Sequence, residues 1–154
     1  MATQNLPAGD LHYAREFKAP HTLVFRCMTE PAHLTHFWGP AGVTTPLDSI
    51  VIDLRPGGAF EADMINNTDG SRYRMQATYV EISPPERLVW TEAGSGMTTT
   101  VTFVDHGPTR SEVLIRQTNV PVPAQSPEAR AGFLTSLDRF TTYLANLLEG
   151  TDAS

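Results

Sequence analysis

The chain has 154 residues, which is enough for one domain with a substantial core and too few for two. Seventeen acidic residues against eleven basic ones give a net charge of −6, which argues against a protein that binds nucleic acid or anionic membranes. The single cysteine, Cys27, excludes a disulfide within the chain.

The first ten residues are polar and lack both the basic start and the apolar centre of a signal peptide. No run in the sequence approaches the roughly 20 apolar residues of a membrane span. We therefore expect a flexible N-terminus over residues 1–10, a single domain over residues 11–150 and a cytoplasmic location.

The N-terminal part of that domain is predicted to begin with a strand over residues 11–17. A short apolar helix over residues 21–28 follows Pro20, which suits a first helical turn. A second short helix is predicted over residues 29–37, and a strand over residues 47–54 follows it. The pattern up to this point is one strand, two short helices and a second strand.

Five further strands form the middle of the chain, separated by short segments rich in Gly, Pro and Asn. Connections this short indicate that successive strands are antiparallel neighbours. The predicted strands cover residues 59–65, 72–82, 87–93, 98–104 and 109–118.

The last predicted element is one long helix that starts at Pro127 and ends at Gly150. It would be about 34 Å long, which is enough to cross a whole sheet of this size. Its apolar residues recur at helical spacing and form a single stripe. They are Phe133, Leu137, Phe140, Leu144 and Leu147.

The predicted sheet and the long helix each have one apolar face to bury, and each is the only large partner for the other. We therefore predict an α+β fold in which an antiparallel sheet of seven strands curves around the C-terminal helix. A strongly twisted sheet leaves a gap where it diverges from the helix. The thirteen aromatic residues and five methionines either fill this gap or line it.

The order of elements and several short motifs resemble the helix-grip superfamily, also called Bet v 1-like, START-like or SRPBCC. Within it, the chain is most similar to the activator of Hsp90 ATPase homologue family. The resemblance covers roughly residues 11–148. It rests on the segments at residues 15–20, 29–34, 37–40, 53–60, 69–70 and 79–88, which read REFKAP, TEPAHL, FWGP, DLRPGGAF, DG and YVEISPPERL.

The resemblance implies a curved antiparallel sheet of seven strands wrapped around a long C-terminal helix, with two short helices between the first two strands. It also implies a cavity for an apolar ligand. Strand alternation independently places large side chains on one face of the sheet, opposite the helix stripe. The expected ligand-binding residues are therefore Phe60, Met64, Tyr73, Met75, Tyr79, Trp90, Phe103, Phe133, Leu137 and Phe140. The alternative is that these residues fill a closed core.

Phe37 and Trp38 precede a Gly-Pro loop, and they are predicted to form either an aromatic gate to the cavity or a plug that seals the fold.

Two residues are candidates for catalysis. Glu92 shares its face of the strand with Trp90, so its carboxyl group would point into an apolar space and could act as a general base. His36 is expected near the cavity rim.

The sequence favours neither a metal nor another cofactor. His33, His36 and Cys27 lie near one another in sequence, but no metal-binding motif surrounds them. There is likewise no nucleophile elbow and no phosphate-binding loop. The chemistry therefore has to come from the shape of the cavity and a few polar side chains.

Three functions follow from these patterns. The leading one is a protein that binds an apolar or aromatic small molecule between sheet and helix. The alternative is an enzyme of the polyketide cyclase, aromatase or hydrolase type that uses the same cavity, and the third is a co-chaperone or interaction module of the Hsp90 kind. We expect neither nucleic acid nor membrane as a partner, whereas exposed edge strands make a homodimer a further expectation.

Overall fold

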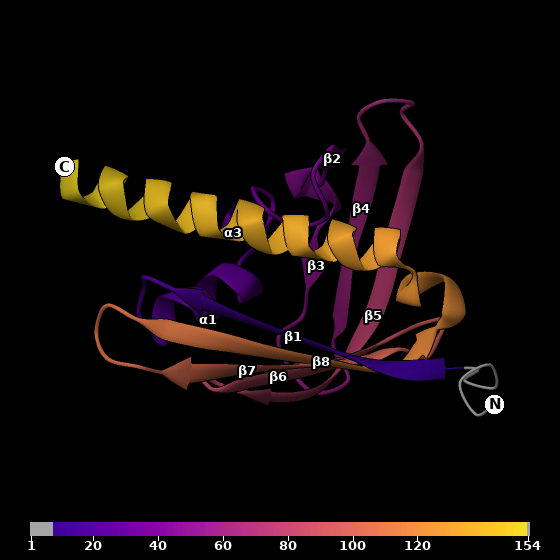
Figure 1. Ribbon diagram of the computed structural model, residues 1–154, viewed down its shortest axis with the longest axis horizontal. Helices are drawn as coiled ribbons and strands as arrows, with labels where there is room; N and C mark the ends of the chain where they lie inside the picture. The colour runs from indigo at the N-terminus through magenta and orange to yellow at the C-terminus, as the bar shows by residue number, and fades with distance from the viewer. Residues whose placement is uncertain (1–7, 154) are drawn as a thin grey trace.

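An antiparallel sheet of eight strands curls beneath one long C-terminal helix in the computed structural model, which describes residues 8–153 (Figure 1). The strand order is β1-β8-β7-β6-β5-β4-β2, and β3 also pairs with β4. The helix-grip arrangement expected from the sequence is confirmed. The strands are β1 Ala8–Phe17, β2 Val43–Thr44, β3 Val51–Ile52, β4 Ala59–Asn66, β5 Arg72–Ser83, β6 Arg87–Glu92, β7 Thr98–Asp105 and β8 Ser111–Pro121.

Two short helices follow β1, and the long helix α3, Pro127–Ala153, closes the fold. Ser126 caps α3, because its hydroxyl oxygen accepts a hydrogen bond of 3.0 Å from the backbone N–H of Ala129. None of the helices among residues 8–153 is long and apolar enough to cross a bilayer. The shorter helices are α1 His21–Thr29, α2 Pro31–Leu34 and the single 3₁₀ turns η2 Leu47–Ser49 and η3 Val122–Gln125.

The space between sheet and α3 is filled unevenly along the helix. The β4–β5 hairpin rises beside the N-terminal half of α3, and α1 lies between the sheet and the more C-terminal part of the helix (Figure 1). Phe25 of α1 packs edge-on against Phe103 of β7, with ring centroids 5.2 Å apart. Helix α1 therefore occupies the space beneath the more C-terminal part of α3. No helix formed by residues 8–153 lies between the sheet and the N-terminal part of α3 (Figure 1).

The alternation predicted for the strands is confirmed, because the inward positions are buried in register across the sheet. The buried inward residues include Phe60, Ala62, Met75, Ala77, Tyr79, Leu88, Trp90, Val101 and Phe103. Cys27 is fully buried, as expected for a small apolar residue, and burial raises the pKa of its thiol to about 12. The stripe of α3 faces the same core through Leu137, Phe140 and Leu144.

The strand predicted over residues 47–54 is largely wrong. Residues Leu47–Ser49 form a 3₁₀ turn, and only Val51 and Ile52 pair with β4. The Ser49 hydroxyl donates a 2.7 Å hydrogen bond to the Pro46 carbonyl, so local side-chain bonding replaces strand pairing here. The two-residue strand β2 was not predicted and accounts for the eighth strand.

Two predicted boundaries also differ. β1 begins at Ala8, three residues before the expected strand, and residues 1–7 of the expected flexible segment lie outside the described residues. Helix α3 continues past Gly150 to Ala153. A glycine permits a helix to end without requiring it, and it costs only about 1 kcal/mol within one.

The turn at residues 55–58 is a scaffold feature. Gly57 has a φ of +84°, a left-handed conformation that L side chains rarely adopt. A Cβ atom at Gly58 would collide with the Asp53 carbonyl oxygen. The turn therefore requires glycine at both positions.

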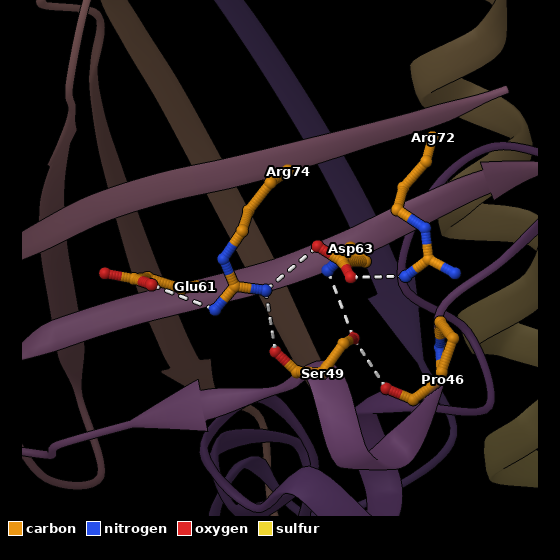
Figure 2. A network of polar contacts seen from close by, with 6 residues as sticks. All are labelled: Pro46, Ser49, Glu61, Asp63, Arg72 and Arg74. Atoms are coloured by element: carbon orange, nitrogen blue, oxygen red, sulfur yellow. Dashed lines mark hydrogen bonds and ion pairs between the residues drawn. The ribbon is translucent and has the colours of Figure 1, made fainter.

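The outer face of the β4–β5 hairpin carries a network of ion pairs (Figure 2). Arg74 contacts Glu61 and Asp63 at 2.9 Å each, and Arg72 contacts Asp63 at 2.6 Å. Asp63 also ties β4 to η2, because its backbone N–H donates to the Ser49 hydroxyl at 3.1 Å. Hydrogen bonds from Arg74 and then Arg72 lower the pKa of Asp63.

We expect Asp63→Asn to lower the free energy of unfolding at neutral pH. A carboxylate whose pKa is lowered in the folded state adds stability above its unfolded pKa and loses it as the pH falls through the folded value. The difference between variant and wild type should therefore shrink in acid. Urea unfolding at several pH values measures this. The control is Asp48→Asn, since exposed Asp48 makes no ion pair among the described residues; equal effects of the two variants would contradict the prediction.

Candidate functional site

A pocket of about 450 Å³ lies under the N-terminal half of α3. It occupies the part of the space between helix and sheet that α1 does not fill. Its floor comes from β4 to β8, its roof from α3, and its side wall from the loop after α2. This is the gap in which the sequence analysis expected large apolar residues.

Ten of the 23 residues that line this pocket are aromatic residues or methionines. Four of the five methionines line it. Methionine is flexible and polarizable, so such a wall can adapt to different apolar shapes. The aromatic and methionine lining residues are Met28, Phe37, Trp38, Met64, Tyr73, Met75, Trp90, Met97, Phe133 and Phe140.

The roof is hollow because small residues follow one another along α3. Ala129, Gly132 and Ser136 all line the pocket, and they are flanked by the larger side chains of Phe133 and Phe140. Residues three or four apart lie on the same face of a helix. The helix therefore presents a small-residue strip above the sheet at this end.

The loop after α2 forms the side wall. Phe37 stacks on Phe140 with ring centroids 4.0 Å apart and planes 3° apart. Trp38 lies 6.2 Å from Trp90 and 5.2 Å from Phe60, measured between ring centroids. Phe37 is thus part of the core packing as well as the wall, whereas half-buried Trp38 is the more superficial of the two.

Arg139 of α3 fixes this wall, and the sequence analysis did not identify it. Its guanidinium donates hydrogen bonds to the carbonyl oxygens of Gly39 and Pro40 at 2.8 and 3.0 Å. Burial lowers the pKa of Arg139. The Ala41 backbone N–H adds a second tie, since it donates to the Thr135 hydroxyl at 3.0 Å. The loop is therefore anchored to the same helix that roofs the pocket.

Most residues expected to bind a ligand line the pocket, but three lie elsewhere. Phe60, Tyr79 and Phe103 are buried in the core and do not reach it. Phe60 stacks on Tyr79 with centroids 5.4 Å apart, and α1 covers Phe103 through Phe25. The expected residues that do line it are Phe37, Trp38, Met64, Tyr73, Met75, Trp90, Phe133, Leu137 and Phe140.

His36 lies away from the pocket. It is exposed and stacks on Tyr143 of α3 with ring centroids 5.0 Å apart. The neighbouring His33 contacts the Tyr143 hydroxyl through Nδ1 at 2.5 Å. Both histidines therefore pack against Tyr143, outside the pocket lining, where they hold α2 and the turn after it to α3.

Glu92 does line the pocket, at the end under the start of α3. Its carboxylate makes no hydrogen bond or ion pair with another described residue, and burial raises its pKa. Burial raises the pKa of Tyr73, another lining residue, and the negative charge of Glu92 raises it further. Glu92 is thus an unpaired carboxyl group in an apolar setting.

We expect Glu92→Gln to raise the free energy of unfolding at neutral pH. Because the folded state raises the pKa of Glu92, its charged form is a stability cost above the folded pKa, and this cost disappears below the unfolded pKa. The gain should therefore vanish in acid, below about pH 4. Urea unfolding at both pH values tests this. Glu61→Gln, which removes a carboxylate that pairs with Arg74, should give no gain, and a loss of stability in Glu92→Gln would contradict the prediction.

Several lining residues were not predicted, among them the polar residues Thr99 and Gln117. Thr99 and Gln117 lie on β7 and β8, on the same face as the predicted Phe103 and the buried Val113. The alternation of these strands could have found them. No group of three metal-ligating side chains comes together among residues 8–153.

Comparison with known proteins places this geometry in a family. Residues 18–145 match the family model described as "Activator of Hsp90 ATPase homolog 1-like protein". The match covers most of the chain. The chain belongs to this family. The family's helix-grip fold is in general one that binds small hydrophobic ligands.

Solved structures agree with this family assignment at the level of the fold. Protein CV1439 from Chromobacterium violaceum is 23% identical with a TM-score of 0.79, and covers 86% of this chain and 95% of its own. Protein NE0264 from Nitrosomonas europaea is 24% identical with a TM-score of 0.77, over 95% of this chain and 97% of its own. The AHSA1 protein from Silicibacter pomeroyi is 22% identical with a TM-score of 0.74, over 88% and 97%. No curated protein matches the chain.

Proposed function

We propose that this family member binds an apolar or aromatic small molecule in the pocket between the sheet and α3. The observation that carries the proposal is the pocket of about 450 Å³ with its aromatic and methionine walls. Ligand sites are typically concave, mostly apolar and furnished with a few polar groups, and this pocket fits each of these features. An aromatic ligand would contact Trp38, Trp90 and Phe133.

Native mass spectrometry of the purified protein, followed by thermal unfolding with a panel of aromatic and lipid compounds, tests this proposal. A ligand present at about 100 times its Kd should raise Tm by about 5–10 °C for a chain of this size. We expect either a co-purifying small molecule or such a shift with an aromatic compound. Neither a bound molecule nor any shift across the panel would contradict the proposal.

A second candidate function is proton-transfer catalysis in the same pocket, of the kind that a polyketide cyclase or aromatase performs. It is favoured by one observation, the unpaired carboxyl group of Glu92 with its raised pKa. The pocket would position the substrate and Glu92 would act as the base. With a substrate in hand, Glu92→Gln should abolish turnover without unfolding the protein, and unchanged turnover would remove Glu92 from the mechanism.

A further inference from the structure

The polar groups inside the pocket are concentrated at one end. Thr99 of β7 and Gln117 of β8 are direct cross-strand partners, and both line the pocket. They are 3% and 8% exposed, respectively. The Thr99 hydroxyl is buried with no hydrogen-bond partner. The Gln117 side-chain amide makes no hydrogen bond with another described residue, but its atoms are not fully buried. Buried polar groups are normally paired, so the Thr99 hydroxyl lacks a partner that a ligand could supply, and the Gln117 amide is free to bind one.

Glu92 lies beside this pair. Trp90 of β6 is the cross-strand partner of Thr99, so Glu92, two residues further along β6, is the diagonal neighbour of Thr99 on the same face. Diagonal neighbours of this kind have Cα atoms roughly 7–8 Å apart. Glu92, Thr99 and Gln117 therefore form a polar row across β6, β7 and β8 on the floor of the pocket.

The charged groups of this pocket are all acidic. Among the residues that the structure describes, Glu92 and the exposed Glu128 of α3 are the only charged side chains that line it, and no lysine, arginine or histidine does so. Arg139 directs its guanidinium to the loop carbonyls instead. A half-buried carboxylate without a cation nearby is unfavourable, and a ligand with its own carboxylate would add repulsion. The faces of Trp90 and Tyr73 in the same lining attract a positive charge.

We propose that the pocket takes an amphipathic amine, an aromatic or alicyclic body that carries a protonated amino group. This inference rests on the proposed function and specifies its ligand class. The ammonium group donates hydrogen bonds to the Glu92 carboxylate, the Thr99 hydroxyl oxygen and the Gln117 amide oxygen. The apolar body lies under α3 against Met75, Trp90 and Phe133. An acid with the same body is disfavoured by the negative charge of the pocket.

Three naphthalene probes with the substituent at the same ring position test this: naphthylmethylamine, naphthylmethanol and naphthoic acid. They share one apolar body and differ in their polar end. In isothermal titration calorimetry at neutral pH, we expect the amine to bind at least about tenfold more tightly than the alcohol, and the acid most weakly. An alcohol that binds as tightly as the amine, or an acid that binds more tightly, would overturn the inference while leaving the proposed function intact. Absence of binding by all three would also overturn the inference, whereas the proposed function is overturned only if the wider compound panel and native mass spectrometry show no ligand either.

The variant Glu92→Gln tests whether Glu92 is responsible for the preference for the amine over the alcohol. In this variant the advantage of the amine over the alcohol should fall below about threefold, while the affinity of the alcohol stays the same. The matched control is Glu61→Gln on the outer face, which should keep the full advantage. A variant Glu92→Gln that still prefers the amine by tenfold would overturn the role of this carboxylate and with it the inference.

The pH dependence of amine affinity tests the charge of Glu92 directly, because a change in packing alone would not make the affinity depend on pH. The titratable groups that face Glu92 are Tyr73 of β5 and Glu128 of α3. Protonation of Glu92 removes the negative charge, while the probe's amino group stays protonated in acid. Amine affinity should therefore fall as the pH is lowered, and alcohol affinity should not. An amine affinity that is constant through this range would contradict the inference.

Discussion

Phe140→Ala is expected to lower the free energy of unfolding by about 3–5 kcal/mol, the largest effect of any substitution considered for this protein. Phe140 is 2% exposed and stacks on Phe37 with ring centroids 4.0 Å apart. It also packs against Phe17 of β1 at 4.9 Å. Its removal would therefore detach α3 from both the sheet and the side wall of the pocket.

Urea unfolding measures this loss, and the matched control is Leu134→Ala on the same helix. Leu134 is 44% exposed, and alanine suits a helix, so we expect a change of less than about 1 kcal/mol. A loss below about 1 kcal/mol for Phe140→Ala, or equal losses for the two variants, would contradict the packing of α3 on the sheet described here.

Ser136→Phe is expected to weaken the binding of aromatic ligands by about tenfold or more. Ser136 lines the roof of the pocket in the row of small residues between Gly132 and Phe140. A phenyl group at this position would occupy the space that the ligand needs. Because the surroundings are apolar, the same group should leave the stability unchanged or raise it.

Calorimetric titration with naphthylmethylamine and naphthylmethanol, together with thermal unfolding, tests Ser136→Phe. The matched control is Leu134→Phe, which adds the same ring to the exposed side of α3 and should leave both affinities unchanged. Wild-type affinity in a stable Ser136→Phe variant would mean that the ligand does not bind under α3.

The fold could be predicted from the sequence because its periodicities are strong. Alternation along β4, β5 and β6 correctly placed Phe60, Met75 and Trp90 on the inner face, and the stripe of α3 correctly faced them. The segment after Pro46 was mispredicted because its apolar residues favour a strand, whereas the Ser49 hydroxyl bonds locally to Pro46.

The division between pocket wall and closed core could not be predicted in the same way. Phe60 and Met64 alternate on one strand, but only Met64 reaches the pocket. Phe60 is covered by Trp38 from the loop after α2, with ring centroids 5.2 Å apart, which is a long-range packing result that no local pattern encodes. The polar row of Thr99 and Gln117 was within reach of strand alternation, whereas Arg139 acts through loop carbonyls and leaves no sequence pattern.

An apolar ligand is proposed to bind beneath the N-terminal half of α3. Methionine methyl groups can report it directly, because Met28, Met64, Met75 and Met97 all line the pocket. We would label the methionine methyls with ¹³C and titrate the protein with naphthylmethanol, the neutral probe. Saturable shifts of these four methyl signals are the predicted result. Spectra in which none of the four signals moves, at probe concentrations that saturate other sites on the protein, would contradict the account.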